Sequence, residues 1–217
     1  MKHLEIKCKS LDFLLNGGIE NSIITKIFGE AGSGKTNLCL QASRECTNNE
    51  KKVAYIDSEG VSLERLIQIC TDYNYKDILS RIIFFNPSSI EEQELMLEEA
   101  LKIKNLGLII VDTINLFYRI NLEDNKEGTM RSFTRQMANL QIASREKKIY
   151  TIIVEQVFTD KNGNIKPFTN RDTEHMVKTS IKLEKVDVGL RQATIVKHRS
   201  EPEEKKVIFK ITQKGLE

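Results

Sequence analysis

Residues 23–36 read IITKIFGEAGSGKT, and this stretch decides the fold. Its second half, GEAGSGKT, matches the pattern G-x-x-x-x-G-K-[ST], in which glycines let the backbone wrap around a phosphate group with its N–H groups pointing inward. The apolar run before the glycines is typical of a buried strand, and a helical pattern begins at Lys35. Because both neighbours suit the pattern, we expect a phosphate-binding loop (P-loop) rather than an ordinary glycine-rich turn.

The P-loop predicts a site for ATP and Mg²⁺. Lys35 is expected to reach the β- and γ-phosphates, and the Thr36 hydroxyl to hold the magnesium ion. The residues predicted to bind the nucleotide belong to the loop and to the first turn of its helix. They are Gly29, Glu30, Ala31, Gly32, Ser33, Gly34, Lys35, Thr36 and Asn37.

Outside the P-loop, apolar β-branched runs alternate with longer stretches of helical period, which is typical of βα units around a parallel sheet. Strands are predicted at 23–28, 52–57, 81–85, 108–112 and 150–155, and helices at 35–46, 63–73, 89–104 and 128–147. After residue 171 we expect strands at 179–186, 193–197 and 206–212 that extend the sheet as antiparallel hairpins. The predicted class is therefore α/β, with a mostly parallel central sheet flanked by helices.

Length and composition limit the classes of protein that the chain can be. Its 217 residues suit one domain, and no repeat or linker interrupts them, so we expect a single domain over residues 1–217. With 40% hydrophobic and 29% charged residues, the chain is expected to be folded, soluble and cytoplasmic, without a signal peptide or a membrane span. The four cysteines lack zinc-like spacing, which favours reduced thiols. A net charge of +2 neither demands nor excludes a polyanionic partner.

Two acidic residues follow predicted strands. Asp112 ends the apolar run LGLIIVD, where a carboxylate can order the magnesium ion of a P-loop protein. The alternative is that Asp112 caps the next helix. Glu59 follows VAYID and is the best candidate to orient and deprotonate an attacking water molecule. Its alternative is an acid at a helix N-terminus, a position that the helix dipole favours.

Four stretches together resemble the ATPase core of the RecA/RadA recombinases: LDFLLNGGIENSIITKIFGEAGSGKTNLCLQ, YIDSEG, LIIVDTINLFYR and FTRQMANL. They occur in matching order across nearly the whole chain. Within the superfamily the chain resembles small archaeal paralogues of RadA, because it starts directly at the core and ends in KHRSEPEEKKVIFKITQKGLE. The resemblance implies a RecA-like ATPase core without an N-terminal helix-hairpin-helix domain.

The resemblance also implies roles for single residues. Glu59 matches the catalytic glutamate of the family, and Asp112 matches its Walker B aspartate, a magnesium-site residue together with Thr36. Gln156 matches the glutamine that senses the γ-phosphate, and Glu155 stands where recombinases usually have asparagine. Arg65 matches the arginine that lies over adenine, with a surface arginine as the alternative. The implied catalytic set is Lys35, Glu59 and Gln156.

By the same resemblance, two loops hold DNA. Loop one is expected at residues 119–130 and loop two at residues 158–173. The implied DNA-binding residues are basic and lie in or just after these loops: Arg131, Arg135, Lys161, Lys166 and Arg171. Binding to single-stranded DNA should depend on salt and select weakly for sequence, and Phe158 and Phe168 either stack on bases or pack within the loop.

The segment KHR contains Lys197 and Arg199, which lie two apart on a predicted strand and so should point to one face. Related oligomeric ATPases, including those resembling KaiC, use a K-x-R pair at this place across a subunit boundary. Lys197 and Arg199 are therefore candidates to act in trans, and a basic strand end in solvent is the alternative. The polymerisation motif of RadA-like recombinases precedes the core, and little chain precedes the core in this sequence. We therefore expect a homodimer or a short oligomer rather than a long filament.

The leading hypothesis is an ATP-binding and single-stranded-DNA-binding accessory protein of homologous recombination and DNA repair, with weak Mg²⁺-dependent ATP hydrolysis. Such a protein would be cytoplasmic and nucleoid-associated. The resemblance implies a RadA-type recombinase and a Holliday-junction resolvase as partners. The alternative is a KaiC-like regulatory ATPase or autokinase that acts on protein partners without DNA. A third hypothesis is a nucleotide-binding module with negligible turnover.

Overall fold

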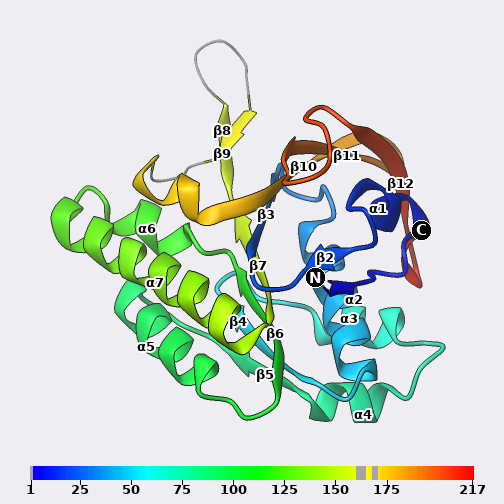
Figure 1. Cartoon of the computed structure of the whole chain (residues 1–217), viewed down its shortest axis with the longest axis horizontal. Coiled ribbons are helices and arrows are strands. Elements are labelled where there is room, and N and C mark those ends of the chain that lie inside the picture. Colours follow the sequence, from blue (N-terminus) through cyan, green and yellow to red (C-terminus); the bar gives the residue numbers. More distant parts are fainter. Residues whose placement is uncertain (1, 160–164, 168–170) are drawn as a thin grey trace.

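The computed structural model describes residues 2–159, 165–167 and 171–217, and its centre is a nine-stranded sheet (Figure 1). The strand order is β13-β12-β11-β10-β3-β7-β6-β4-β5. In chain order these strands are β3 (Ile24–Gly29), β4 (Lys52–Asp57), β5 (Ile82–Phe85), β6 (Leu106–Asp112), β7 (Tyr150–Glu155), β10 (Val177–Asp187), β11 (Leu190–Lys197), β12 (Lys206–Thr212) and β13 (Gly215–Leu216). Every strand predicted before residue 171 is present, with bounds within two residues of the prediction. A separate pair, β1 (His3–Leu4) and β2 (Ile19–Glu20), lies near the N-terminus.

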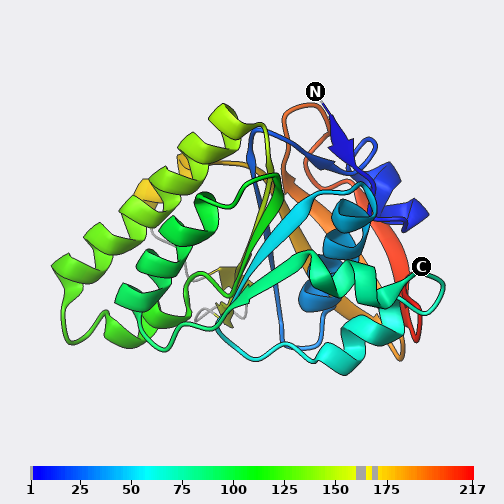
Figure 2. The same cartoon turned by 90° about the horizontal axis from the view of Figure 1, so that it is seen from below.

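Helices cover both faces of the sheet (Figure 2). One face packs against α1 (Lys9–Leu14), α2 (Lys35–Asn48), α3 (Leu63–Ile69) and α4 (Tyr75–Ser80). The other face packs against α5 (Ile90–Leu101), α6 (Leu116–Asn121) and α7 (Lys126–Lys147). Successive strand residues serve opposite cores, so Ile109 and Ile110, both fully buried, belong to different apolar clusters. None of the described helices has the length and apolar content that a bilayer crossing requires.

The predicted helix at 63–73 is wrong in its second half, because α3 ends at Ile69 and α4 follows as a separate helix. Two side chains satisfy the last carbonyl groups of α3. The Thr71 hydroxyl donates to the carbonyl of Gln68 at 2.6 Å, and Arg44 donates to the carbonyl of Ile69 at 2.8 Å. Helix ends need such partners, so these contacts fix the end of α3.

The C-terminal strands extend the sheet, but the first of them does so in the parallel direction. β10 pairs with β3 in parallel, whereas the pairs β10–β11 and β11–β12 are antiparallel as predicted, and the short β13 adds a further antiparallel pair with β12. β10 lies on the far side of β3 from β7, so the chain crosses over β3 before it pairs. A crossover returns a strand in the same direction, whereas a tight turn reverses it.

The described residues of both predicted loops include regular secondary structure. Within loop two, β8 (Val157–Thr159) and β9 (Ile165–Pro167) form an antiparallel pair that projects from the body in Figure 1, and a 3₁₀ helix follows at Arg171–Met176. Most of loop one is helical, because α6 ends at Asn121 and α7 already begins at Lys126. The Asn125 side chain accepts a hydrogen bond from the N–H of Gly128 at 3.1 Å and so caps α7.

Candidate nucleotide site

The predicted nucleotide residues meet at the carboxyl ends of β3, β4, β6 and β7. These four strands are parallel neighbours, so the residues that follow them lie at one edge of the sheet. The P-loop follows β3 and leads into α2. Glu59 follows β4, Asp112 ends β6, and Gln156 follows β7.

The P-loop lies close to its neighbours, and glycine is required where it leaves β3. A Cβ atom at Gly29, whose φ is +152°, would lie 2.0 Å from the carbonyl oxygen of Leu183. Inside the loop, the Lys35 ammonium donates to the carbonyls of Gly29 at 2.8 Å and Glu30 at 2.9 Å. Burial lowers the pKa of Lys35, and the nearby carboxylates of Asp112 and Glu59 oppose this effect.

Thr36 and Asp112, the predicted magnesium residues, are in direct contact. The Thr36 hydroxyl donates to Oδ2 of Asp112 at 2.9 Å, and the Tyr55 hydroxyl donates to the same oxygen at 2.8 Å. Asp112 is only 3% exposed, and this burial raises the pKa of its carboxyl group, whereas the two hydroxyl donors lower it. A hydroxyl and a carboxylate are hard oxygen ligands, which fits Mg²⁺ if phosphate oxygens and water complete its coordination.

The Glu59 carboxylate faces the other strand ends rather than a helix N-terminus. Its Oε1 accepts hydrogen bonds from the Thr113 hydroxyl at 2.7 Å and from Nε2 of Gln156 at 2.6 Å. The turn that presents Glu59 is shaped by Asp57, whose carboxylate accepts from the N–H groups of residues 59–61. Helix α3 begins later, with Ser62 as its N-cap. The geometry therefore favours the site role of Glu59 over the capping role.

Gln156 is held between the site and α6. Its backbone N–H donates to Oδ1 of Asn115 at 2.9 Å, and its carbonyl accepts from Nδ2 of the same side chain at 3.2 Å. Its side-chain oxygen accepts a hydrogen bond from Arg119 of α6. Gln156 thus links the Glu59 carboxylate with α6 and with the first residue of β8.

Glu155 has a buried cation as a partner, which explains a carboxylate at this position. The Lys26 ammonium on β3, with a side chain 1% exposed, lies 3.6 Å from Oε2 of Glu155. It also donates to both carboxylate oxygens of Glu174 at 2.7 Å. Glu155 precedes the β8–β9 hairpin and Glu174 follows it, so one ammonium joins the two ends of that segment.

Arg65 is anchored to the first turn of the P-loop helix. Its Nε donates to Oδ1 of Asn37 at 2.7 Å, and its Nη2 donates to the carbonyl of Thr212 at 2.7 Å. Burial lowers the pKa of the guanidinium group. Arg65 is therefore held between α2 and the turn after β12 rather than free on the surface, and its contact with a base stays a prediction.

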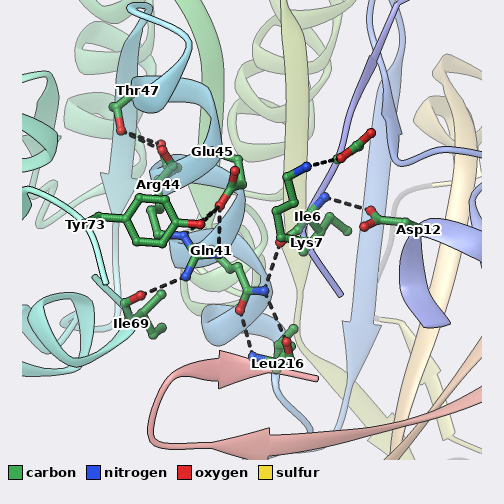
Figure 3. A network of polar contacts seen from close by, with 12 residues as sticks. Ile6, Lys7, Asp12, Gln41, Arg44, Glu45, Thr47, Ile69, Tyr73 and Leu216 are labelled. Carbon is green, nitrogen blue, oxygen red and sulfur yellow. Dashed lines mark hydrogen bonds and ion pairs between the residues drawn. The ribbon is translucent and has the colours of Figure 1, made fainter. Parts of the chain in front are cut away.

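The helix that follows the P-loop is fixed by buried polar contacts, drawn in Figure 3. The Gln41 amide donates to the carbonyls of Ile6 at 2.9 Å and Leu216 at 3.2 Å, and accepts from the N–H of Leu216 at 2.7 Å. On the next turn, Arg44 pairs with Glu45 at 2.7 Å. One helix therefore holds both terminal segments of the chain beside the P-loop.

The predicted DNA-binding residues that the structure describes lie on α7, on β9 and in the 3₁₀ helix. Arg131 and Arg135 are exposed on α7 and paired, Arg131 with Glu127 at 3.2 Å and Arg135 with Glu94 at 2.6 Å. Lys161 and Phe168 lie outside the described residues. Lys166 belongs to β9 and Arg171 begins the 3₁₀ helix, but their side chains are outside the described part. Phe158 on β8 is 43% exposed.

Lys197 and Arg199 do not share a strand, so that prediction is wrong. β11 ends at Lys197, and Arg199 lies in the bend that follows it. The chain bends there because the N–H groups of Ser200 and Glu201 turn back to donate to the His198 ring. In the sheet, Lys197 of β11 pairs with Ser180 of β10. Ser180 comes three residues before Leu183, the β10 residue that pairs with Gly29 at the start of the P-loop. Both candidates lie away from the P-loop of their own chain.

The sequence reasoning missed several residues that shape the site: Tyr55, Asp57, Thr113, Asn115 and Arg119. A signal existed for two of them. Asp57 ends the strand YID as Asp112 ends IIVD, and Tyr55, two residues earlier, shares a strand face with it. The roles of the other three depend on contacts between strand ends that no local pattern reveals.

Comparison with known proteins agrees with this geometry. A family model described as Rad51 matches residues 1–217. The chain is 44% identical to the DNA repair and recombination protein RadB of Methanococcoides burtonii, over 96% of this chain and 95% of the relative. It is 36% identical to RadB of Thermoplasma acidophilum, over 95% and 90%. A crystal structure of the RadB recombinase superposes with a TM-score of 0.87 at 35% identity, covering 98% of both chains. The chain belongs to the Rad51 family, among its RadB proteins.

Proposed function

We propose that the chain binds ATP and Mg²⁺ at the P-loop, hydrolyses ATP slowly, and binds single-stranded DNA as an accessory protein of recombination and repair. The observation that supports this most is the set of contacts from Glu59 through Gln156 to Arg119. It connects the carboxylate best placed to activate water with the two segments expected to meet DNA. A nucleotide-dependent change at Glu59 can therefore reach both of them.

In the proposed reaction, Lys35 neutralises charge on the β- and γ-phosphates, while Thr36 and Asp112 hold the magnesium ion. The ion supplies electrostatic stabilisation of the phosphate oxygens. Glu59 orients the attacking water molecule and accepts its proton. Thr113 and Gln156, both within 2.7 Å of one Glu59 oxygen, keep the carboxylate in place. Arg65 and Asn37 are proposed to meet the base.

The DNA part of the proposal rests on the RadB relatives, which are named DNA repair and recombination proteins. Arg131, Arg135 and the β8–β9 hairpin with Lys161, Lys166 and Arg171 are the proposed contacts. Because Arg131 and Arg135 already pair with carboxylates, DNA phosphate has to displace these acids, and weak, salt-sensitive binding is expected. We propose a RadA-type recombinase and a Holliday-junction resolvase as protein partners, and a homodimer or short oligomer as the assembly.

Glu59→Gln tests the catalytic part of the proposal. Phosphate release should fall by about 100-fold or more, because a general base contributes about 10²–10⁴ to a rate, while ATP binding persists. Glu64→Gln, an exposed acid in the first turn of α3, is the matched control and should keep the wild-type rate. Equal background rates in wild type and Glu59→Gln would show instead a module that binds nucleotide without turnover.

Fluorescence anisotropy with labelled oligothymidylate, at low and high salt and with or without ATP, tests the DNA part. Reversal of charge at Arg131 and Arg135 should weaken binding, whereas the same change at Arg145, exposed near the other end of α7, should have a smaller effect. Absence of binding at low salt, with hydrolysis intact, would contradict this part. That result would favour the alternative, a regulatory ATPase acting on protein partners.

A further inference from the structure

The C-terminal strands form the surface on which the outer side of the P-loop lies. A Cβ atom at Gly34 would be 3.2 Å from Cδ1 of Ile211 on β12. Leu183 of β10 pairs with Gly29, so the rest of β10 continues beside the loop after β3 has ended. The next residue of β10 on the same face as Leu183 is Lys185, and its partner on β11 is Arg191.

Lys185 places an ammonium group against the backbone of the P-loop. A Cβ atom at Gly32 would lie 3.0 Å from both Cε and Nζ of Lys185. The side chain is exposed, and among the described residues the structure gives this ammonium neither a hydrogen bond nor an ion pair. Lys182, on the opposite face of β10, is instead paired with Glu184 at 2.6 Å. Lys185 is therefore a cation available to a ligand of the loop.

Arg191 acts on the same glycine from β11. Its Nε donates to the carbonyl oxygen of Gly32 at 2.9 Å, and its Nη1 is held by the carbonyl of Leu190 at 2.8 Å. The carbonyl of Gly32 and the N–H of Ser33 belong to one planar trans peptide, so they point in opposite directions. With the carbonyl held on the outer side by Arg191, the N–H of Ser33 faces the interior of the loop, where it donates to Glu30 at 3.2 Å.

We propose that the β10–β11 hairpin completes the phosphate site of its own chain for a nucleoside triphosphate. Lys185 adds a second ammonium, besides that of Lys35, to the charge that attracts the triphosphate. Arg191 is a positioning residue that keeps the N–H of the Gly32–Ser33 peptide on the inner side of the loop, where a phosphate oxygen would replace the carbonyl of Glu30 as its acceptor. The inference rests on the proposed function in one respect, because it requires that the P-loop binds nucleotide.

The charge of the nucleotide determines how much its affinity gains from the Lys185 ammonium. A loop of this kind binds phosphate through N–H groups at hydrogen-bond distance, so a cation in contact with its backbone interacts with the bound phosphates. ATP has one more phosphate group than ADP and gains more from an added cation. A backbone N–H aimed at a phosphate that both nucleotides share benefits them equally. Lys185 is thus expected to favour ATP over ADP, and Arg191 to serve both.

Titration with fluorescent analogues of ATP and ADP in the presence of Mg²⁺ tests both roles. Lys185→Ala should weaken ATP binding about tenfold and ADP binding about threefold or less, with an unchanged Tm because the side chain is exposed. Lys182→Ala removes a cation from the other face of the same strand and should leave both affinities as in wild type. Arg191→Ala should weaken both nucleotides to the same degree, and Arg191→Lys, which keeps one donor, should restore most of the loss.

The outcomes separate this inference from the proposed function. If wild type binds neither nucleotide, the proposed function fails and this inference fails with it. If wild type binds both nucleotides and Lys185→Ala has the same affinities for them as Lys182→Ala, the proposed role of Lys185 is wrong while the proposed function stands. If Arg191→Ala binds both nucleotides as tightly as wild type, or loses affinity only where its Tm is also lowered and regains it with the Tm in Arg191→Lys, Arg191 is only a structural residue.

Discussion

Asp112 combines a proposed role at the magnesium site with a cost to folding. Its carboxylate is almost fully buried, and desolvation raises its pKa although Tyr55 and Thr36 both donate to it. The acids Glu59 and Asp57 add to the rise. A carboxyl group with a raised pKa in the folded state stabilises the fold only when protonated, so its contribution is lost as the pH rises through the folded pKa. At neutral pH, Asp112 therefore costs stability until a cation is bound.

Asp112→Asn should remove the cost in stability that the buried carboxylate causes at neutral pH. Without Mg²⁺ at neutral pH, the Tm of the variant should equal or exceed that of wild type, because the amide removes the buried charge and its oxygen still accepts a hydrogen bond. The difference in Tm should shrink as the pH is lowered and the wild-type carboxyl group takes up its proton. Mg²⁺ with ATP should raise the Tm of wild type only. A Tm that is lower in the variant at every pH would contradict the prediction, and calorimetry across pH measures it.

At the scale of elements, the ion group of Lys26, Glu155 and Glu174 joins β3 and β7 to the 3₁₀ helix that follows the β8–β9 hairpin. Lys197 adds a hydrogen bond from its ammonium to the carbonyl of Glu174 at 3.2 Å. Because Gln156 directly follows Glu155, the same group also fixes the residue that contacts Glu59. The hairpin is thus attached at both ends to the strand that leads into the P-loop.

Lys26→Met should destabilise the protein by about 3 kcal/mol, since it takes a cation away from the buried carboxylate of Glu155 and from the partly exposed carboxylate of Glu174. The double variant Lys26→Met with Glu155→Gln should recover part of the loss, because one of those carboxylates becomes neutral. Lys210→Met, at an exposed position of β12, is the control and should stay near wild type. Urea unfolding measures all three, and a single variant as stable as its control would show that the ion group is not a structural requirement.

The elements that sequence reasoning placed well are those with strong local patterns. β6 is an almost continuous apolar run, β3 is apolar except for Thr25 and Lys26, and the P-loop between β3 and α2 is a short motif with its own geometry. The missed features depend on contacts between distant residues. The end of α3 needs Arg44, the parallel direction of β10 follows from a crossover, and the ion pair of Arg135 needs Glu94 from another helix. The β8–β9 hairpin did have a local signal, the runs VFT and IKP on either side of Asn-Gly.

At the scale of the whole molecule, the nucleotide site is supported from both ends of the chain. Gln41 on the P-loop helix holds Ile6 and Leu216, and Arg65 reaches the turn after β12. The C-terminal strands β10, β11 and β12 have side chains beside the loop itself, and Figure 1 shows β10 next to β3 with β11 and β12 following outward. Changes in the C-terminal strands are therefore expected to affect nucleotide binding although the P-loop lies near the start of the chain, at residues 29–36.

Lys197 and Arg199 lie away from the P-loop of their own chain. They could therefore contact a nucleotide only at the site of a neighbouring chain. If Lys197 acts in trans, Lys197→Ala alone should lower ATP hydrolysis by at least about tenfold, since cations supplied across a boundary contribute large factors to phosphoryl transfer. An equal mixture of Lys197→Ala with Glu59→Gln should then exceed the rate of either variant, because Glu59→Gln chains supply the lysine and Lys197→Ala chains supply the intact site. A mixture with the double variant Glu59→Gln, Lys197→Ala should gain nothing. Light scattering with ATP shows whether the chains associate, and a mixed rate equal to the mean of its components would mean that Lys197 serves only the backbone of Glu174.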